Sequence, residues 1–90
     1  MDEQLNELAK FFKALADANR LRIVGLLAQK GATGEELAAV LHLHPATISH
    51  HMAVLTKAGL VETKKIGLWR WYRRNETSLR EFARTLKKNL

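Results

Sequence analysis

The side chains of this sequence that are best suited to chemistry lie between His44 and Lys57. The segment holds histidine, serine and threonine side chains and contains no carboxylate. At about 100° per residue, the small and hydrogen-bonding side chains fall on one face of a helix. Such a surface suits the DNA major groove, where base edges offer hydrogen-bond donors and acceptors. The candidate DNA-contacting residues of this segment are His44, Pro45, Ala46, Thr47, Ser49, His50 and Lys57.

The opposite face of the same segment predicts a helix that packs on a hydrophobic core. Pro45 can stand in the first turn, where its missing N–H has no intrahelical partner. Gly59 can end the helix in the left-handed conformation, with Leu60 supplying the usual apolar contact. We therefore expect a helix over about 45–57. Its inward stripe, at i, i+3, i+4 and i+7, is Ile48, His51, Met52 and Leu55.

The residues before this helix predict a helix-turn-helix. Thr33 and Glu36 form a capping-box pattern that begins a short helix over 34–41. Only three residues separate that helix from Pro45. A turn of this length joins the two helices of helix-turn-helix motifs, so the helix over 45–57 would be the recognition helix.

Another helix is expected upstream, over 18–29. Asp17 is a good N-cap for it, and Gly31 lies just beyond its end, where a C-cap glycine is common. Its expected inward residues are Leu21, Ile23, Val24 and Leu27.

After the recognition helix the residue pattern changes to that of a β-hairpin. Two strands are expected over 60–65 and 68–74, with Gly67 in the turn and lysines near the tip. Trp69 and Trp71 alternate along the second strand, and we expect them to pack on the helices. Stacking on nucleic-acid bases is the alternative. A basic hairpin after a recognition helix is a wing, here over about 60–74, with Lys64, Lys65 and Arg70 as DNA-contacting candidates.

Helices at both ends of the chain carry wide apolar faces. The first is expected over 3–15. The last, over about 78–89, begins at a capping-box pattern formed by Ser78 and Glu81. Apolar faces this wide on a small protein indicate a partner subunit across a twofold axis. The candidate dimer-interface residues are Leu5, Leu8, Phe12, Leu79, Phe82 and Leu86.

Length, charge and composition indicate one small domain over residues 1–90 with a polyanionic partner. The net charge is +6, and the residues from 42 onward carry ten Lys or Arg against three Glu. A basic half of this kind favours nucleic acid. There is no membrane-spanning apolar run and no cysteine. Both features fit a cytoplasmic protein that needs no disulfides.

Neither a metal site nor a catalytic centre is predicted. The chain's four histidines fall within ten residues. However, His50 and His51 point about 100° apart on a helix, so a set of metal ligands does not converge. There is no cysteine nucleophile or glycine-rich phosphate loop, and Ser49 beside His50 does not bring the imidazole onto the hydroxyl. We therefore expect no metal, no cofactor and no enzymatic activity.

Three segments of the chain match a known family in order and spacing. They are FKALADANRLRIVGLL (12–27), ELAAVLHL (36–43) and PATISHHMAVLTKAGLV (45–61). Together with Gly67, Trp69 and Tyr72 in the wing, they make the sequence resemble the ArsR/SmtB family of dimeric winged-helix transcriptional regulators. The resemblance covers roughly residues 5–74.

This resemblance implies a dimer and roles for particular residues. The dimer would form through the first and last helices, with a recognition helix in each major groove and the wings on the flanking DNA backbone. By position, Thr47, Ser49 and His50 would read bases or nearby phosphates. Most members repress transcription, and many release DNA on binding a metal ion. The cysteine pair of the metal sensors is absent here, and the last helix offers only Glu81 among basic residues, so no inducer is indicated.

The predicted fold is mainly α (α+β), a winged helix-turn-helix with about five helices and a two-stranded β-hairpin wing. The predicted function is that of a homodimeric, sequence-specific repressor that binds double-stranded DNA. Two alternatives remain open at this stage, a winged-helix module that docks on other proteins and a protein that binds nucleic acid without sequence preference. The carboxylate-free helix face favours DNA over a protein partner.

Overall fold

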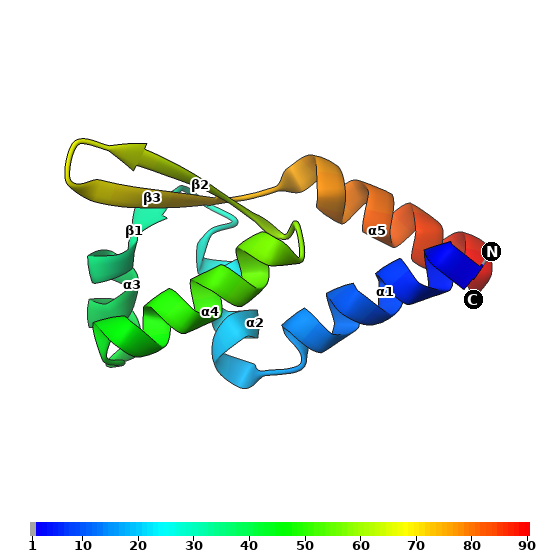
Figure 1. Cartoon of the computed structure of the whole chain (residues 1–90), viewed down its shortest axis with the longest axis horizontal. Coiled ribbons are helices and arrows are strands. Elements are labelled where there is room, and N and C mark those ends of the chain that lie inside the picture. Colours follow the sequence, from blue (N-terminus) through cyan, green and yellow to red (C-terminus); the bar gives the residue numbers. More distant parts are fainter. Residues whose placement is uncertain (1) are drawn as a thin grey trace.

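The computed structural model describes residues 2–90, and Met1 of the expected domain lies outside the described residues. The described chain forms five helices and three strands, which confirms the predicted winged helix-turn-helix. They are α1 (Asp2–Leu15), α2 (Ala18–Leu26), β1 (Ala32–Thr33), α3 (Gly34–Leu41), α4 (Pro45–Lys57), β2 (Val61–Ile66), β3 (Trp69–Arg74) and α5 (Glu76–Asn89). The sheet, α2, α3 and α4 form one end of a molecule 41 Å long, and α1 and α5 extend together to the other end (Figure 1). Over residues 2–90, no helix combines the length and apolarity needed to cross a membrane.

Helix α4 begins and ends where the sequence predicts. Pro45 occupies its first turn, and its inward stripe of Ile48, His51, Met52 and Leu55 is buried. At the C-terminus, Gly59 has a φ of 81° and its N–H donates to the carbonyl of Thr56 at 3.0 Å. The N–H of Leu60 donates to the carbonyl of Leu55, also at 3.0 Å. This pair of bonds satisfies carbonyls that the helix end would otherwise leave without donors.

The predicted capping box at the start of α3 is also confirmed. The Thr33 hydroxyl accepts from the N–H of Glu36 at 3.2 Å, and the Glu36 carboxylate accepts from the N–H of Thr33 at 2.9 Å. The bond from the Thr33 N–H, together with a second from the Thr33 hydroxyl at 3.1 Å, holds the pKa of the Glu36 carboxyl below its ordinary value, since both favour its charged form. His42 ends the helix with a φ of 54°, so the chain turns at once toward α4.

Helix α2 is shorter than predicted. Asp17 is its N-cap, as expected, but the helix ends at Leu26 rather than at residue 29. The N–H of Ala28 bonds to the carbonyl of Gly25 at 3.2 Å, three residues back, so the last turn tightens and the helix stops. The inward prediction for Leu21 was wrong, because its side chain is 54% exposed.

Arg20 connects three helices through its guanidinium group. Its Nε donates to the carbonyl of Ala14 at the end of α1, at 2.6 Å. Its NH1 lies 3.3 Å from Nδ1 of His51, the buried histidine of α4. Because a guanidinium can only donate, Nδ1 of His51 must be the acceptor in this contact. Arg20 thereby fixes the recognition helix relative to α1.

The hairpin belongs to a three-stranded antiparallel sheet in the order β1-β3-β2, whereas the sequence predicted two strands. The extra strand pairs Ala32 with Tyr72 and Thr33 with Trp71. Gly31 precedes it, and a Cβ at this position would lie 3.0 Å from the carbonyl oxygen of Tyr72. The glycine therefore suits the close approach of two strands and does not cap α2, whose C-cap is Leu27. A two-residue strand carries no periodicity that would reveal it in the sequence.

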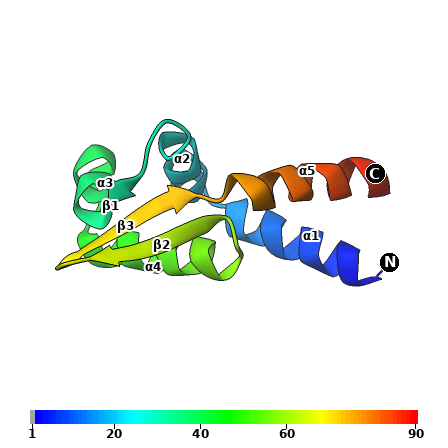
Figure 2. The ribbon, with the colours of Figure 1, turned by 90° about the horizontal axis from the view of Figure 1, so that it is seen from above.

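The predicted packing of Trp69 and Trp71 on the helices was wrong. Their side chains are 52% and 38% exposed, and the buried residue of β3 is Tyr72 on its other face. The alternation along β3 separates two faces but does not say which one meets the core. Tyr72 belongs to the buried core cluster. The tip of the hairpin extends beyond the helices (Figure 2). The helices therefore cover the hairpin only at its base, and only on the face that carries Tyr72.

Helix α5 begins two residues earlier than predicted, at Glu76. Its N-cap is Asn75, whose side chain accepts from the N–H of Ser78 at 3.1 Å, so Ser78 lies inside the helix and does not cap it. The helix packs on α1 through Phe82, whose ring centroid lies 4.8 Å from that of Phe11 and 5.4 Å from that of Phe12. The two outer helices therefore bury part of each other within one chain.

We expect the substitution Leu55→Ala to lower the free energy of unfolding by about 2–5 kcal/mol, because it leaves a cavity in the centre of the core. Leu55 is fully buried. Urea denaturation followed by circular dichroism measures the change. Leu21→Ala is the matched control at an exposed helical leucine, and an equal loss for the two variants would contradict the packing described above.

Acid should destabilise the protein partly through Asp17. The backbone N–H groups of Arg20 and, to a lesser extent, Asn19 hold the pKa of the Asp17 carboxyl below its ordinary value. This carboxylate therefore contributes stability above its ordinary pKa and loses that contribution as the pH falls through the lowered value. Asp17→Asn keeps an N-cap acceptor that does not titrate. The variant should lose less stability than the wild type when urea denaturation is repeated from neutral pH down to acid, and identical profiles would refute this role.

Candidate nucleic-acid interface

The outward face of α4 is open along its whole length. Ala46, Thr47, Ser49 and His50 are exposed, as is Lys57 at the last turn. The alanines leave room for close approach, and the hydroxyl and imidazole groups can both donate and accept hydrogen bonds. The structure therefore brings the residues predicted on this helix together on one continuous surface.

His44 has a local role that the sequence analysis missed. It is the N-cap of α4, and its Nδ1 accepts a hydrogen bond from the N–H of Ala46 at 3.0 Å. Its position directly before Pro45, the first helical residue, could have indicated this, but histidine is not a preferred capping residue. Only Nε2 of His44 is left to contact another molecule.

The β2–β3 hairpin lies alongside α4 (Figures 1 and 2). The hydroxyl oxygens of Thr56 on α4 and Thr63 on β2 are 3.0 Å apart, which ties the hairpin to the helix. Between the two elements runs a groove of about 410 Å³. Its walls include Ser49, Ala53 and Lys57 from α4, with Thr63, Arg70 and Tyr72 from the hairpin.

The strand register separates the predicted basic residues of the wing. Lys65 pairs with Arg70, and Thr63 pairs with Tyr72 on the same face of the hairpin, the face toward α4. Lys64 pairs with Trp71 on the opposite face. Cross-strand partners share a face and alternate along the strand. Lys65 and Arg70 therefore extend the surface of α4, while Lys64 lies on the other side.

The ion pairs of the hairpin involve other basic residues than those on the surface of α4. Arg73 pairs with Glu62 at 2.9 Å, and Arg74 with Glu76 at 2.6 Å, where the guanidinium lowers the pKa of the Glu76 carboxyl. In the part of the chain that the structure describes, Lys57, Lys65 and Arg70 form no ion pair. Their charge remains uncompensated, so the surface attracts an anionic ligand.

Lysines of α1 extend this surface on the other side of α4. Lys10 and Lys13 line a shallow depression of about 390 Å³ together with Lys57, over an apolar floor that includes Val54 and Ala58. Lys10 also pairs with Glu7 of its own helix. No sequence pattern indicated these lysines, because only the packing of α1 beside α4 brings them near the recognition helix.

The four histidines do not gather around one point. His51 faces inward to Arg20, His50 faces outward with its ring centroid 6.0 Å from that of His51, and His44 caps the helix. Across residues 2–90, no group of three His, Asp or Glu side chains has a geometry that could hold a metal ion. The expected absence of a metal stays a prediction.

Comparison with known proteins identifies the family. Residues 15–64 match the family described as a helix-turn-helix domain. Over 71 residues the chain is 39% identical to an HTH-type transcriptional regulator of Methanocaldococcus jannaschii, covering 78% of this chain and 80% of that protein. It is 35% identical over 81 residues to the arsenical resistance operon repressor of Bacillus subtilis, covering 84% and 77%. This protein belongs to the ArsR/SmtB family of winged helix-turn-helix transcriptional regulators.

A solved structure supports the assignment of this protein to the family. It is the homodimeric winged helix-turn-helix DNA-binding domain of a possible ArsR-family regulator from Mycobacterium bovis. Its TM-score is 0.79 at 36% sequence identity, covering 88% of this chain and 74% of that one. The fold described above is therefore that of the family.

Two substitutions should separate base reading from backbone binding. His50→Ala should weaken binding to a preferred duplex by about 1–3 kcal/mol and leave binding to random duplex nearly unchanged, because we expect His50 to contact a base edge. Lys65→Ala should weaken binding to both duplexes alike and reduce the slope of log K against log salt by about one per lost phosphate contact. Fluorescence anisotropy at several salt concentrations measures both effects. Equal losses on both duplexes for His50→Ala would rule out sequence reading at this residue.

Proposed function

We propose that this regulator is a homodimeric repressor that binds specific sequences in double-stranded DNA. Helix α4 enters the major groove, and the hairpin contacts the neighbouring backbone. The observation that carries this proposal is the continuous surface formed by α4, Lys65 and Arg70. It is exposed, carries uncompensated positive charge and has no carboxylate on the outward face of α4.

The dimensions and chemistry of α4 suit the major groove. A helix with its side chains is about 10–12 Å across, and the groove is about 12 Å wide. Ala46 and Ala53 keep the outward face slim, so the backbone can approach the bases. Thr47, Ser49 and His50 then lie where they can bond to base edges, while Lys57, Lys65 and Arg70 lie where they can meet phosphates.

Repression follows from occupying DNA that the transcription machinery must reach. The Bacillus subtilis relative carries the name of a repressor, which supports the same direction of control here. The chain has no cysteine, so thiolate ligands for arsenite or a soft metal are missing. Release from DNA through thiolate coordination is therefore not part of the proposed function.

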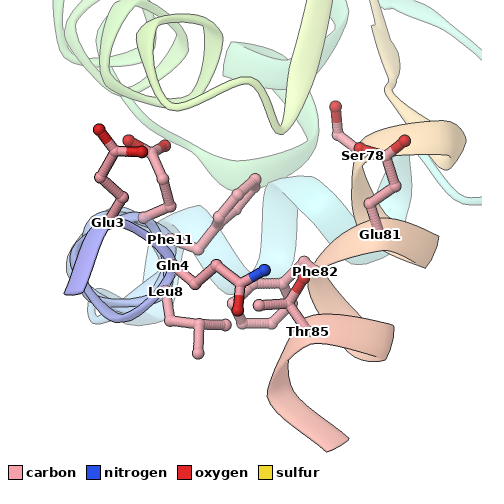
Figure 3. A pocket seen from close by; sticks show the side chains of 9 residues that line it. Glu3, Gln4, Leu8, Phe11, Ser78, Glu81, Phe82 and Thr85 are labelled. Atoms are coloured by element: carbon pink, nitrogen blue, oxygen red, sulfur yellow. The ribbon is translucent and has the colours of Figure 1, made fainter. Parts of the chain in front are cut away.

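The dimer would form through α1 and α5. These helices leave apolar side chains exposed on their outer surfaces, including Leu5 at 43% and Phe12. Between them lies a groove of about 310 Å³, with Leu8, which is buried, and Phe11 on one wall and Phe82 on the other (Figure 3). Its lining also includes Glu3, Glu7 and Glu81. An exposed apolar surface with an open groove is suited to a self-complementary contact across a twofold axis. The homodimeric relative from Mycobacterium bovis supports this arrangement.

Selection from a pool of random duplexes tests the proposed function. The protein should enrich a defined motif with two half-sites, because a symmetric dimer contacts DNA twice, about one helical turn apart. Binding to the enriched duplex should weaken steeply with salt. Recovery of no motif, together with salt-insensitive binding, would favour a module that docks on other proteins.

Leu5→Asp should convert the dimer to monomers, because the interface would bury an unpaired carboxylate. Leu5 is preferable to Phe82 for this test, since Phe82 also packs on Phe11 and Phe12 of its own chain. Sedimentation at micromolar concentration should show a shift from twice the chain mass of 10.2 kDa to that mass. Leu21→Asp is the matched control at an exposed leucine on α2, and a wild type that sediments only as a monomer would rule out the dimer.

A further inference from the structure

Three lysines from two helices gather around the shallow depression beside the recognition helix. Lys10 and Lys13 come from α1 and Lys57 comes from α4. All three side chains are exposed, and no carboxylate lines the depression. Within residues 2–90, Lys13 and Lys57 form no ion pair. Because like charges held together without a counter-ion repel one another, the cluster favours an anionic ligand.

Lys10 is available to such a ligand although it pairs with Glu7 at 3.1 Å. The two side chains of this pair are 68% and 63% exposed, and exposed pairs of this kind contribute little to stability. An anion can therefore draw Lys10 away from Glu7 at small cost. The apolar floor of the depression does not call for an apolar ligand, because the aliphatic stems of lysines can cover it while their charged ends reach outward.

The depression lies on the flank of α4 opposite the hairpin. The groove toward the hairpin is lined by Ser49 and Thr56 of α4. The depression toward α1 is lined by Val54 and Ala58 of the same helix. Lys57 borders both, so the outward face of α4 runs between them. The order across this surface is therefore hairpin, α4, α1.

The lysines of α1 also adjoin the side of that helix that we place in the dimer. Successive residues of a helix point about 100° apart, so Lys13 projects between Phe12 and Ala14. Ala14 is buried in the core, whereas Phe12 is 48% exposed and belongs to the proposed dimer surface. In a dimer formed through α1, the lysines of each subunit therefore lie between its recognition helix and the twofold axis.

We propose that Lys10 and Lys13 bind the DNA backbone in the spacer between the two half-sites. This inference rests on the proposed function and extends the DNA contact from the recognition helix to a helix of the dimer. The half-sites of a symmetric dimer lie about one helical turn apart, and the backbone between them passes the twofold axis. The hairpins lie outside the recognition helices and meet the outer phosphates. The two sets of contacts therefore fall on different parts of the duplex.

The test uses the duplex enriched by selection, with uncharged methylphosphonates in place of chosen phosphates. One modified duplex is neutral in the spacer, and the other is neutral outside the half-sites. Fluorescence anisotropy measures the Kd of each. The wild type should bind each modified duplex roughly tenfold more weakly than the unmodified one, because each modification removes phosphate contacts.

The variants assign these losses to particular lysines. Lys10→Gln/Lys13→Gln should bind the unmodified duplex about as weakly as the wild type binds the spacer-neutral one. It should lose nothing further when the spacer is neutral, yet respond to neutral outer phosphates as the wild type does. Lys65→Gln, on the hairpin, should show the reverse pattern. The control is Lys30→Gln in the segment that joins α2 to β1, which lies across the molecule from α4 (Figure 2), and it should behave as the wild type.

Full sensitivity of Lys10→Gln/Lys13→Gln to spacer neutralisation would overturn this inference and leave the proposed function intact. A wild type that binds the spacer-neutral duplex as tightly as the unmodified one would do the same. If the double variant sediments as a monomer while the wild type is a dimer, the lysines serve self-association and the inference is wrong. If the wild type enriches no duplex at all, the proposed function fails and this inference fails with it.

Discussion

The contact of the Arg20 guanidinium with α1 and α4 is the constraint on which the rest of the structure depends. The last carbonyls of a helix have no partner within it, and Arg20 donates to two of them, those of Ala14 and Lys13. The same group meets His51 on the buried side of α4. The recognition helix is thus held against α1, a helix of the proposed dimer. In the proposed dimer, the distance between the recognition helices of the two subunits would then be set by the packing of α1 and α5 on the partner subunit.

The sheet divides the hairpin into an anchored base and a free tip. Tyr72 is buried over the helices, and β1 pairs with the strand at that point. Between Trp71 and the turn, β2 and β3 pair only with each other within the described residues. The hairpin is therefore fixed in orientation at its base while its tip remains exposed.

The distribution of charge follows the same division. Arg73 and Arg74 at the base of the hairpin are paired with carboxylates, whereas Lys65 and Arg70 toward the tip are not paired within the described chain. Exposed pairs contribute little to stability, but they remove positive charge from the base. Among the basic residues of the hairpin, the charge available to an anion therefore lies toward the tip, at Lys64, Lys65 and Arg70.

The sequence by itself determined the elements whose causes are local. The Asp17 cap, the Thr33–Glu36 capping box and both ends of α4 depend on side chains and backbone groups a few residues apart, and the buried stripe of α4 follows from helical periodicity. Tertiary structure decided everything that needed a partner from far along the chain. Alternation defined two faces of β3, but only the packing of Tyr72 on the helices determined that Trp69 and Trp71 face outward. The strand β1 and the approach of Lys13 to Lys57 likewise arise from contacts between distant segments, which no local pattern records.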